Sequence, residues 1–144
     1  MNGFMKKLRA PLLVAACVAA LTVTAAAPAH AAGGDWLHVS GGQGKASWTW
    51  SSSNPANLDG ITLVAWDQKC DNIGVYTYMR IVNELGYGKD TRKHTDPCSG
   101  GESGVGGLIW RDNARVRGVT VYVCADVTGT DICGWSYYDN PYSS

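Results

Sequence analysis

Short runs in which apolar and polar residues alternate fill the chain after about its first thirty positions. In residues 119–124 three valines occupy one face of an extended strand, while Thr120, Tyr122 and Cys124 occupy the other. A period of two residues is typical of a β-strand that has one face in the core. We therefore expect the valine face to point inward.

Six runs of this kind, and a weaker seventh, are bounded by the Gly, Asn, Asp, Ser and Pro residues that favour turns. They cover residues 36–39, 46–52, 61–67, 75–82, 116–125 and 134–138, with 108–111 as the weaker one. The sequence has no sustained helical period after residue 31, so we expect almost no helix there. This pattern predicts an all-β domain, a small antiparallel β-sandwich of six to seven strands, with a small barrel as the alternative.

The first thirty-one residues have a different pattern. A basic start leads into an apolar stretch from Pro11 to Ala27, and small residues follow at the two positions that a signal peptidase reads, Ala29 and Ala31. These features predict a signal peptide over residues 1–31 and one secreted, extracellular domain over residues 32–144. The alternatives are an uncleaved membrane anchor and a lipid on Cys17, although the apolar stretch continues well past Cys17.

Removal of the leader would leave four of the five cysteines. An even number of cysteines in an oxidising compartment predicts two disulfides. Cys124 and Cys133 flank a turn-like segment, so this pair would clamp the base of a hairpin, and Cys70 with Cys98 would close the other loop. We favour this local pairing among the three possible connectivities. A metal site is disfavoured because there is no C-x-x-C spacing, and we expect no metal or cofactor.

The charge balance also changes with the leader. The chain has twelve basic and twelve acidic residues, and Lys6, Lys7 and Arg9 leave with the leader, so the domain carries a net charge near −3. Nucleic acids and anionic membranes are bound through clustered positive charge. We therefore expect neither a nucleic-acid partner nor a membrane partner after cleavage.

The spacing of reactive residues does not indicate a catalytic centre. Gly101-Glu102-Ser103-Gly104 is comparable with the nucleophile segment of trypsin-like serine proteases, but Val105 stands where that family repeats a glycine. His38 and His94 are the two histidines after the leader, and neither lies in a segment that would supply a general base. We predict that the protein is not an enzyme.

Aromatic residues are the strongest candidates for binding. The chain has six tryptophans and seven tyrosines, each with a polar group on a large apolar body. About half of them are expected to fill the core, and the exposed remainder would form a protein interface or a sugar platform. The candidate binding residues, including a short basic run, are Trp48, Trp50, Tyr76, Tyr78, Lys89, Arg92, Lys93, Trp135 and Tyr138.

The basic run lies in a segment from Gly86 to Gly107 that is too long and too polar for a simple hairpin connection. Lys89, Arg92 and Lys93 precede Cys98, which would tie the segment down. The segment is expected to be either a solvated loop or an interaction loop.

The alanine-rich leader, Val121-Tyr-Val-Cys124 and the ending from Cys133 to Tyr142 resemble a group of small secreted actinobacterial proteins. In build, the chain is similar to the small adaptor subunit of secreted umbrella-type toxin particles. This resemblance implies a non-catalytic connector whose N-terminal stretch, from Ala32 to Gly34 onward, inserts into a partner.

Three functional hypotheses follow. The first is a secreted, non-catalytic protein-recognition domain that serves as a subunit or adaptor of an extracellular, antibacterial toxin-like assembly, with other secreted proteins as partners. The second is an inhibitor of a secreted hydrolase that inserts the 86–107 segment into the enzyme. The third is a carbohydrate-binding module that uses exposed Trp and Tyr residues to bind glycans.

Overall fold

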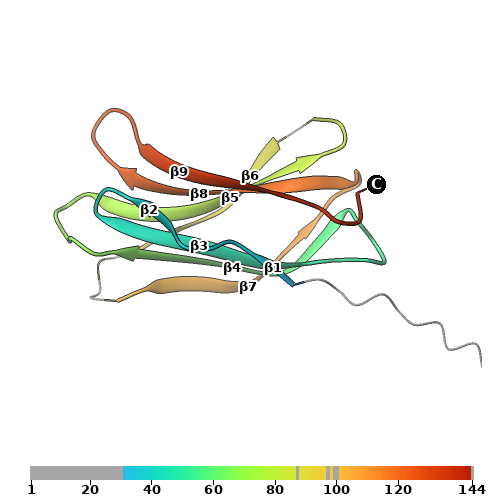
Figure 1. The fold of residues 1–144 in the computed structure, drawn as a ribbon, viewed down its shortest axis with the longest axis horizontal. Helices are drawn as coiled ribbons and strands as arrows, with labels where there is room; N and C mark the ends of the chain where they lie inside the picture. The colour runs from blue at the N-terminus through green and yellow to red at the C-terminus, as the bar shows by residue number, and fades with distance from the viewer. Residues whose placement is uncertain (1–30, 87, 97, 99–100, 144) are drawn as a thin grey trace, which may run out of the picture.

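A computed structural model of the chain describes residues 31–86, 88–96, 98 and 101–143. These residues form nine strands arranged in two layers (Figure 1). In the described part of the chain, no helix has the length and apolar character needed to cross a membrane. The predicted signal peptide, with Cys17, lies outside the described residues except for Ala31.

The first layer, sheet A, contains five strands with antiparallel pairing. Its order is β1-β3-β4-β7, and β2 also pairs with β3, beyond the end of β1. The bounds are Ala31–Gly33 for β1, Leu37–Val39 for β2, Gly42–Trp50 for β3, Asn57–Asp67 for β4 and Ser103–Arg111 for β7.

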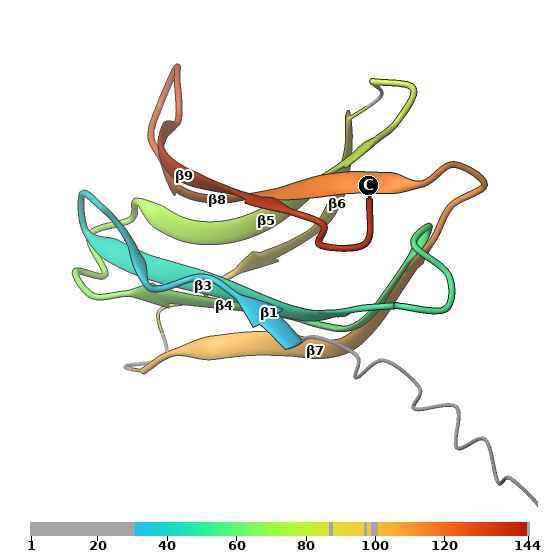
Figure 2. The same cartoon turned by 45° about the vertical axis from the view of Figure 1, so that its right-hand side comes forward.

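The second layer, sheet B, contains four antiparallel strands in the order β6-β5-β8-β9 (Figure 2). The bounds are Gly88–Thr95 for β6, Gly74–Asn83 for β5, Val116–Asp126 for β8 and Ile132–Asp139 for β9. The chain crosses from sheet A to sheet B after β4, returns for β7, and finishes in sheet B. Two stacked antiparallel sheets of this kind are a β-sandwich.

The core lies between the facing sides of the two sheets. Val119, Val121 and Val123 of β8 are at most 1% exposed, which confirms the predicted inward face. Trp48 and Trp50 of β3 pack into the same core with their rings edge to face at 5.6 Å between centroids. The remaining fully buried large side chains are Leu58, Ile61, Leu63, Val75, Met79, Ile81 and Val116.

The two sheets approach each other closely at the start of β3. Thr77 of β5 is fully buried, and its hydroxyl donates a hydrogen bond across the sandwich to the carbonyl of Val64 in β4 at 2.7 Å. The absence of a side chain at Gly44 makes room for this hydroxyl, because a Cβ there would overlap Thr77 Oγ1 and lie 2.8 Å from the Val64 carbonyl oxygen. Glycine therefore permits a hydrogen bond that ties the two layers together.

The predicted fold class is confirmed: the domain is all-β, with two antiparallel sheets and two disulfides. The cysteines pair as Cys70–Cys98 and Cys124–Cys133, the connectivity that the sequence favours. All seven predicted runs lie wholly or largely in strands, and the weaker one, 108–111, is the second half of β7.

Two sequence-based expectations are wrong. The segment from Gly86 to Gly107 is not a long loop, since β6 and the first half of β7 occupy most of its described residues. Trp48 and Trp50 are not surface residues, because they are 1% and 2% exposed. Both tryptophans lie on the side of β3 that faces sheet B, where bulky rings fill the space between the layers.

Candidate functional site

The outer side of sheet B carries a group of aromatic side chains that we call the aromatic face. It consists of Tyr76 and Tyr78 from β5, Tyr122 from β8, and Trp135 and Tyr137 from β9. These residues alternate along their strands with the inward core residues, so the strand period itself places them on the outside. Tyr78 pairs directly with Tyr122, and Tyr122 pairs directly with Trp135, so three aromatic residues lie in one row across three strands.

The tyrosine rings of this row pack against one another. Tyr78 and Tyr122 are stacked with centroids 4.6 Å apart and planes 3° from parallel. Tyr76 stacks on Tyr78 at 6.0 Å, with an angle of 30° between the planes. The flat faces of these rings are thus used within the molecule, and each ring supports the orientation of its neighbour.

Exposure rises from one end of the aromatic face to the other. Tyr76 is 7% exposed, whereas Trp135 is 65% exposed and Tyr137 is 43% exposed. The Tyr76 hydroxyl donates a hydrogen bond to the carboxylate of Asp131 in the β8–β9 turn. Burial, followed by the interaction with Asp131, raises the pKa of Tyr76 well above its ordinary value. The β5 end is therefore fixed, and the large accessible rings lie on the edge strand β9.

Two contacts hold the exposed end of the aromatic face in place. The Cys124–Cys133 disulfide joins β8 to β9 at the pair next to Tyr122 and Trp135 on the same side of the sheet. The ring of Tyr137 lies over Gly118 of β8, where a Cβ would overlap its hydroxyl end. Burial, followed by the charge of Asp139, raises the pKa of Tyr137 above its ordinary value. Rigid aromatic groups lose little conformational entropy when a ligand binds to them.

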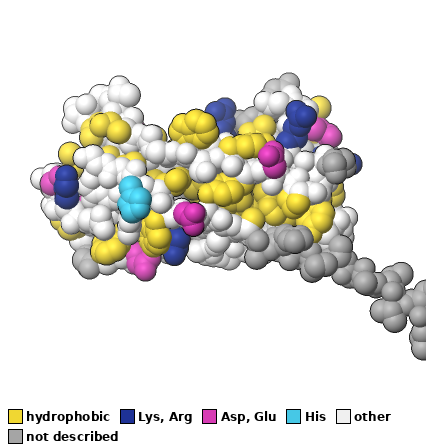
Figure 3. Space-filling model, in the orientation of Figure 1, with side chains coloured by type: hydrophobic (Ala, Val, Ile, Leu, Met, Phe, Trp, Pro, Cys, Tyr) yellow, Lys and Arg dark blue, Asp and Glu magenta, His cyan; other side chains and the backbone are white. Residues whose placement is uncertain are grey.

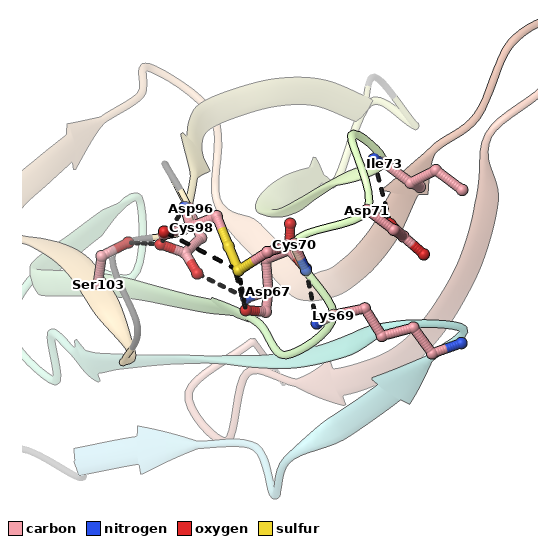
Figure 4. Close-up of a disulfide and its surroundings, with 8 residues drawn as sticks. All are labelled: Asp67, Lys69, Cys70, Asp71, Ile73, Asp96, Cys98 and Ser103. Atoms are coloured by element: carbon pink, nitrogen blue, oxygen red, sulfur yellow. Dashed lines mark hydrogen bonds between the residues drawn. A yellow bond between two sulfur atoms is a disulfide. The ribbon is translucent and has the colours of Figure 1, made fainter.

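A second group of polar residues surrounds the Cys70–Cys98 disulfide (Figure 4). Asp96 is only 3% exposed, and its carboxylate accepts hydrogen bonds from the backbone N–H of Asp67 at 2.6 Å and of Cys98 at 3.2 Å. It also accepts one from the Ser103 hydroxyl at 3.1 Å. Asp96 thus links the end of β4, the segment after β6 and the start of β7.

His94, Ser103 and Asp96 meet in this group, but their hydrogen bonds follow a different order from that of a catalytic triad. Ser103 Oγ lies 2.9 Å from His94 Nε2 and donates a hydrogen bond to Asp96 Oδ1. In a triad the histidine lies between the serine and the carboxylate and accepts the serine proton. Here the serine lies in the middle and its hydroxyl donates a hydrogen bond to the carboxylate, so the arrangement is suited to holding strands together.

A shallow pocket of about 290 Å³ lies beside the same disulfide and is lined by Asp67, Cys70, Asn72, Gly74, Asp96 and Cys98. Potential ligand atoms of Asp67, Cys70 and Cys98 lie within 4.8 Å of one another. Both sulfur atoms, however, belong to the disulfide and are not thiolates, the form in which cysteine binds metals. One oxygen of Asp67 accepts the backbone N–H groups of Lys69 and Cys70. The carboxylates near this pocket therefore serve backbone donors.

The structure separates the sequence-predicted binding residues into three groups. Tyr76, Tyr78 and Trp135 come together on the aromatic face. Tyr138 points the other way and packs against Trp48 at 5.2 Å between ring centroids, so its ring lines the core. The basic run Lys89, Arg92 and Lys93 lies in β6, and the side chains of these three residues lie outside the described part of the structure.

The sequence-based set omits two members of the aromatic face, Tyr122 and Tyr137. Tyr122 alternates with the inward valines of β8, and that pattern alone identifies it as outward-facing. Tyr137 is adjacent to Tyr138, and sequence does not show which of the two neighbours faces out until the strand has a register. Comparisons with protein-family models, with curated proteins and with solved structures find no match to this chain.

Proposed function

We propose that this protein is a secreted, non-catalytic recognition domain that binds another protein through the aromatic face. The observation that carries the proposal is the row Tyr78, Tyr122, Trp135 on the outer side of sheet B, which ends in a tryptophan that is 65% exposed. Tryptophan and tyrosine are enriched among the residues that contribute most to protein–protein binding. The neighbouring disulfide supports this reading because it keeps the row rigid.

The packing of the rings favours a protein over a sugar as the main ligand. A sugar ring stacks on an open aromatic face, but Tyr78 and Tyr122 cover each other's faces at 4.6 Å. Edges and hydroxyl groups of stacked rings suit the mixed apolar and hydrogen-bonding contacts of a protein interface. Within this proposal, the domain acts as a subunit or adaptor of an extracellular assembly. An antibacterial toxin particle is the assembly that the sequence resemblance implies.

Affinity capture tests the proposal. The domain, with both disulfides formed, is immobilised and exposed to culture supernatant of the producing organism, in parallel with Trp135→Ala and Trp66→Ala variants. Trp66 is the matched control because it is a half-buried tryptophan on the outer side of sheet A, paired with Gln43. Loss of a central tryptophan typically costs about 2 kcal/mol of binding energy, roughly a thirtyfold loss of affinity. Trp135→Ala should therefore release the partner, while Trp66→Ala should retain it. Failure to retain any protein, or equal retention by Trp135→Ala, would contradict the proposal.

A glycan is the second candidate ligand, and the exposure of Trp135 is the observation that favours it. Titration of cell-wall and chitin-type oligosaccharides against tryptophan fluorescence tests this candidate. A change in the wild type that is absent from Trp135→Phe would support sugar binding at Trp135. An unchanged spectrum across the glycans would remove this candidate. The inhibitor hypothesis has less support, since most of the described residues in its proposed loop are strand.

A further inference from the structure

The backbone of β9 has a defined set of outward-pointing hydrogen-bonding groups. In an antiparallel pair, directly opposed residues that do not exchange hydrogen bonds have Cα atoms about 4.5 Å apart, against about 5.5 Å for those that do. The Cα atoms of Cys124 and Cys133 are 4.1 Å apart, so this pair is of the first kind. The bond from the Asn140 N–H to the Arg117 carbonyl, at 2.8 Å, continues the same ladder and agrees with this assignment.

It follows that the even-numbered residues of β9 bond to β8, and the odd-numbered ones turn their N–H and C=O groups away from it. Cys133, Trp135 and Tyr137 therefore present backbone donors and acceptors at the free edge of sheet B. In the described part of the chain, β9 pairs with β8 alone. The same three residues place their side chains on the outer side of the sheet. The free backbone groups and the accessible aromatic rings thus belong to the same residues.

The other edges of the two sheets carry features that discourage strand addition. Edge strands are commonly protected by shortness, by bulges or by charged side chains. On one edge of sheet A, β1 and β2 have only three residues each. On the other, the pairing of β7 with β4 shifts register twice, and Gly60 and Gly107 have φ values of +59° and +69°. In sheet B, β6 is bulged against β5 and its sequence contains three basic residues.

Strand β9 is neither short nor bulged, and its single charged residue, Asp139, lies at its C-terminal end. It forms eight consecutive pairs with β8 without a register shift, and its sequence contains no Lys, Arg or Pro. It is the outermost strand of sheet B on the side that faces the viewer in Figure 1. Hydrophobic side chains are visible on this side of the molecule in Figure 3. The β9 edge is thus a long, regular and partly apolar template for another strand.

Exposed carboxylates lie near one end of the aromatic face. Asp131, in the β8–β9 turn, accepts a hydrogen bond from the Tyr76 hydroxyl of β5, and Asp126, at the end of β8, pairs with Gly74 of β5. At the opposite end, the charge of Asp139 is accompanied by Arg117, which also acts on Tyr137. The Asp131 end therefore has the stronger negative character. A complementary strand carries a basic residue there.

We propose that a partner protein adds a β-strand to sheet B along the free edge of β9. This inference rests on the proposed function and specifies how the partner binds. The occupant is an extended segment whose backbone bonds to Cys133, Trp135 and Tyr137. Its apolar or β-branched side chains, at alternate positions, lie beside the aromatic face, and a basic residue lies near Asp131. Strand addition of this kind draws affinity from backbone hydrogen bonds and specificity from alternate side chains.

A second copy of this chain, paired in the register centred on Trp135, is a poorer occupant. Two β9 strands that pair antiparallel around a twofold axis at Trp135 would place Asp131 of each copy opposite Asp139 of the other. Like charges directly opposite each other across a strand pair are unfavourable. This register pairs residues 132–138 of the two copies, whereas a register centred on Ser136 pairs residues 133–139 and places Asp139 opposite Cys133. Self-pairing is therefore a separate outcome of the experiment below.

A peptide probe tests the inference by a backbone readout. The probe is a synthetic peptide of alternating Val and Thr with a Lys at each end, added at millimolar concentration to the isotope-labelled protein. In a paired strand, the residues opposite Trp135 and Tyr137 have side chains on the aromatic face, so the Val residues take these positions. We expect amide hydrogen exchange at Trp135 and Tyr137 to slow by at least tenfold. Exchange at Gly134 and Ser136, already bonded to β8, should change little.

Two N-methylated peptides serve as matched controls with the same side chains. In antiparallel addition, methylation of the Val amides blocks the hydrogen bonds to β9 and should abolish protection, whereas methylation of the Thr amides should preserve it. Equal behaviour of the two peptides, or peptide binding without protection of these amides, would overturn the inference. Protection of the Trp135 and Tyr137 amides that rises with protein concentration in the absence of peptide would show that a second copy of the chain pairs with β9. That result would also overturn the inference.

The result is separable from the test of the proposed function. If Trp135→Ala loses a captured partner but neither the peptide nor that partner protects the Trp135 and Tyr137 amides, only strand addition fails. If the domain captures no protein whose binding depends on Trp135, the proposed function fails on its own test.

Discussion

The hydrogen bond between the two sheets leads to a prediction about Gly44. A Cβ at this position would overlap Thr77 Oγ1 and would lie 2.8 Å from the Val64 carbonyl oxygen and 3.0 Å from Val123 Cγ2. Thr77 is fully buried, so its hydroxyl has nowhere to bond if it rotates away from Val64. Gly44→Ala should therefore break the bond and force the layers apart locally.

The expected cost of Gly44→Ala has two parts. A buried hydroxyl or carbonyl that loses its partner costs about 1–3 kcal/mol, and overpacking in a well-filled core costs about 1–3 kcal/mol. Reduced freedom of the unfolded chain returns about 0.4–1 kcal/mol. The net loss in the free energy of unfolding is therefore about 1–5.6 kcal/mol. At about 4 °C per kcal/mol for a domain of this size, Tm should fall by roughly 4–22 °C.

Urea unfolding followed by tryptophan fluorescence measures the effect, since Trp48 and Trp50 lie in the core. Gly74→Ala is the matched control, because a Cβ there meets only Thr95 Cγ2, at 3.8 Å. Gly44→Ala should also cost at least about 1 kcal/mol less in a Thr77→Ala background, because the clashing hydroxyl is gone. A loss below about 0.5 kcal/mol, or the same loss in both backgrounds, would refute this account of the contact between the sheets.

Three further predictions concern stability. The pKa of Tyr76 is raised in the folded protein above its unfolded value of 10.0, so its contribution to the free energy of unfolding is complete below pH 10 and is lost as pH rises. In urea unfolding, Tyr76→Phe should therefore make the fall of the free energy of unfolding between pH 9 and 11 shallower. Burial would raise the pKa of Asp112, but hydrogen bonds from the backbone N–H groups of Ala114 and Asn113 outweigh it and lower the pKa below 3.8. In urea unfolding, the wild type should therefore have a higher free energy of unfolding than Asp112→Asn at pH 7, and this difference should shrink by pH 3. Replacing both cysteines of the Cys70–Cys98 bridge, which spans 28 residues, with alanine should cost about 3–4 kcal/mol by thermal unfolding, and a cost below about 1 kcal/mol would contradict the chain-entropy account.

The aromatic face and the core use the same residue types for different purposes. Trp48 is 1% exposed and Trp135 is 65% exposed, although each alternates with smaller residues in a strand. Trp48 lies on the side of β3 that is covered by sheet B. Trp135 lies on the side of β9 that no described strand covers. Burial of a tryptophan is thus decided by the sheet that faces it.

The sequence predicted local features well. The alternation of the β8 valines identified both a strand and its inward face, because the side-chain period of a strand depends only on its own backbone. Pairing Cys124 with Cys133 followed from a short turn-like segment between them. The short polar segments between runs marked where strands end. These features could be predicted because the interactions that determine them connect residues near one another in the chain.

The sequence predicted the Cys70–Cys98 bridge, but other features that depend on distant residues were not predicted. The β6 segment, Gly88–Thr95, has no aliphatic residue and no Phe, Tyr or Trp, and it is a strand because it pairs with the edge of β5. Likewise, the row Tyr78, Tyr122, Trp135 exists only through the registers of two strand pairs. By itself, the sequence determined which segments extend and which of their faces are apolar. The tertiary structure alone decided which strands pair, which face each sheet covers and which edge stays open, because those outcomes depend on contacts between residues far apart in the chain.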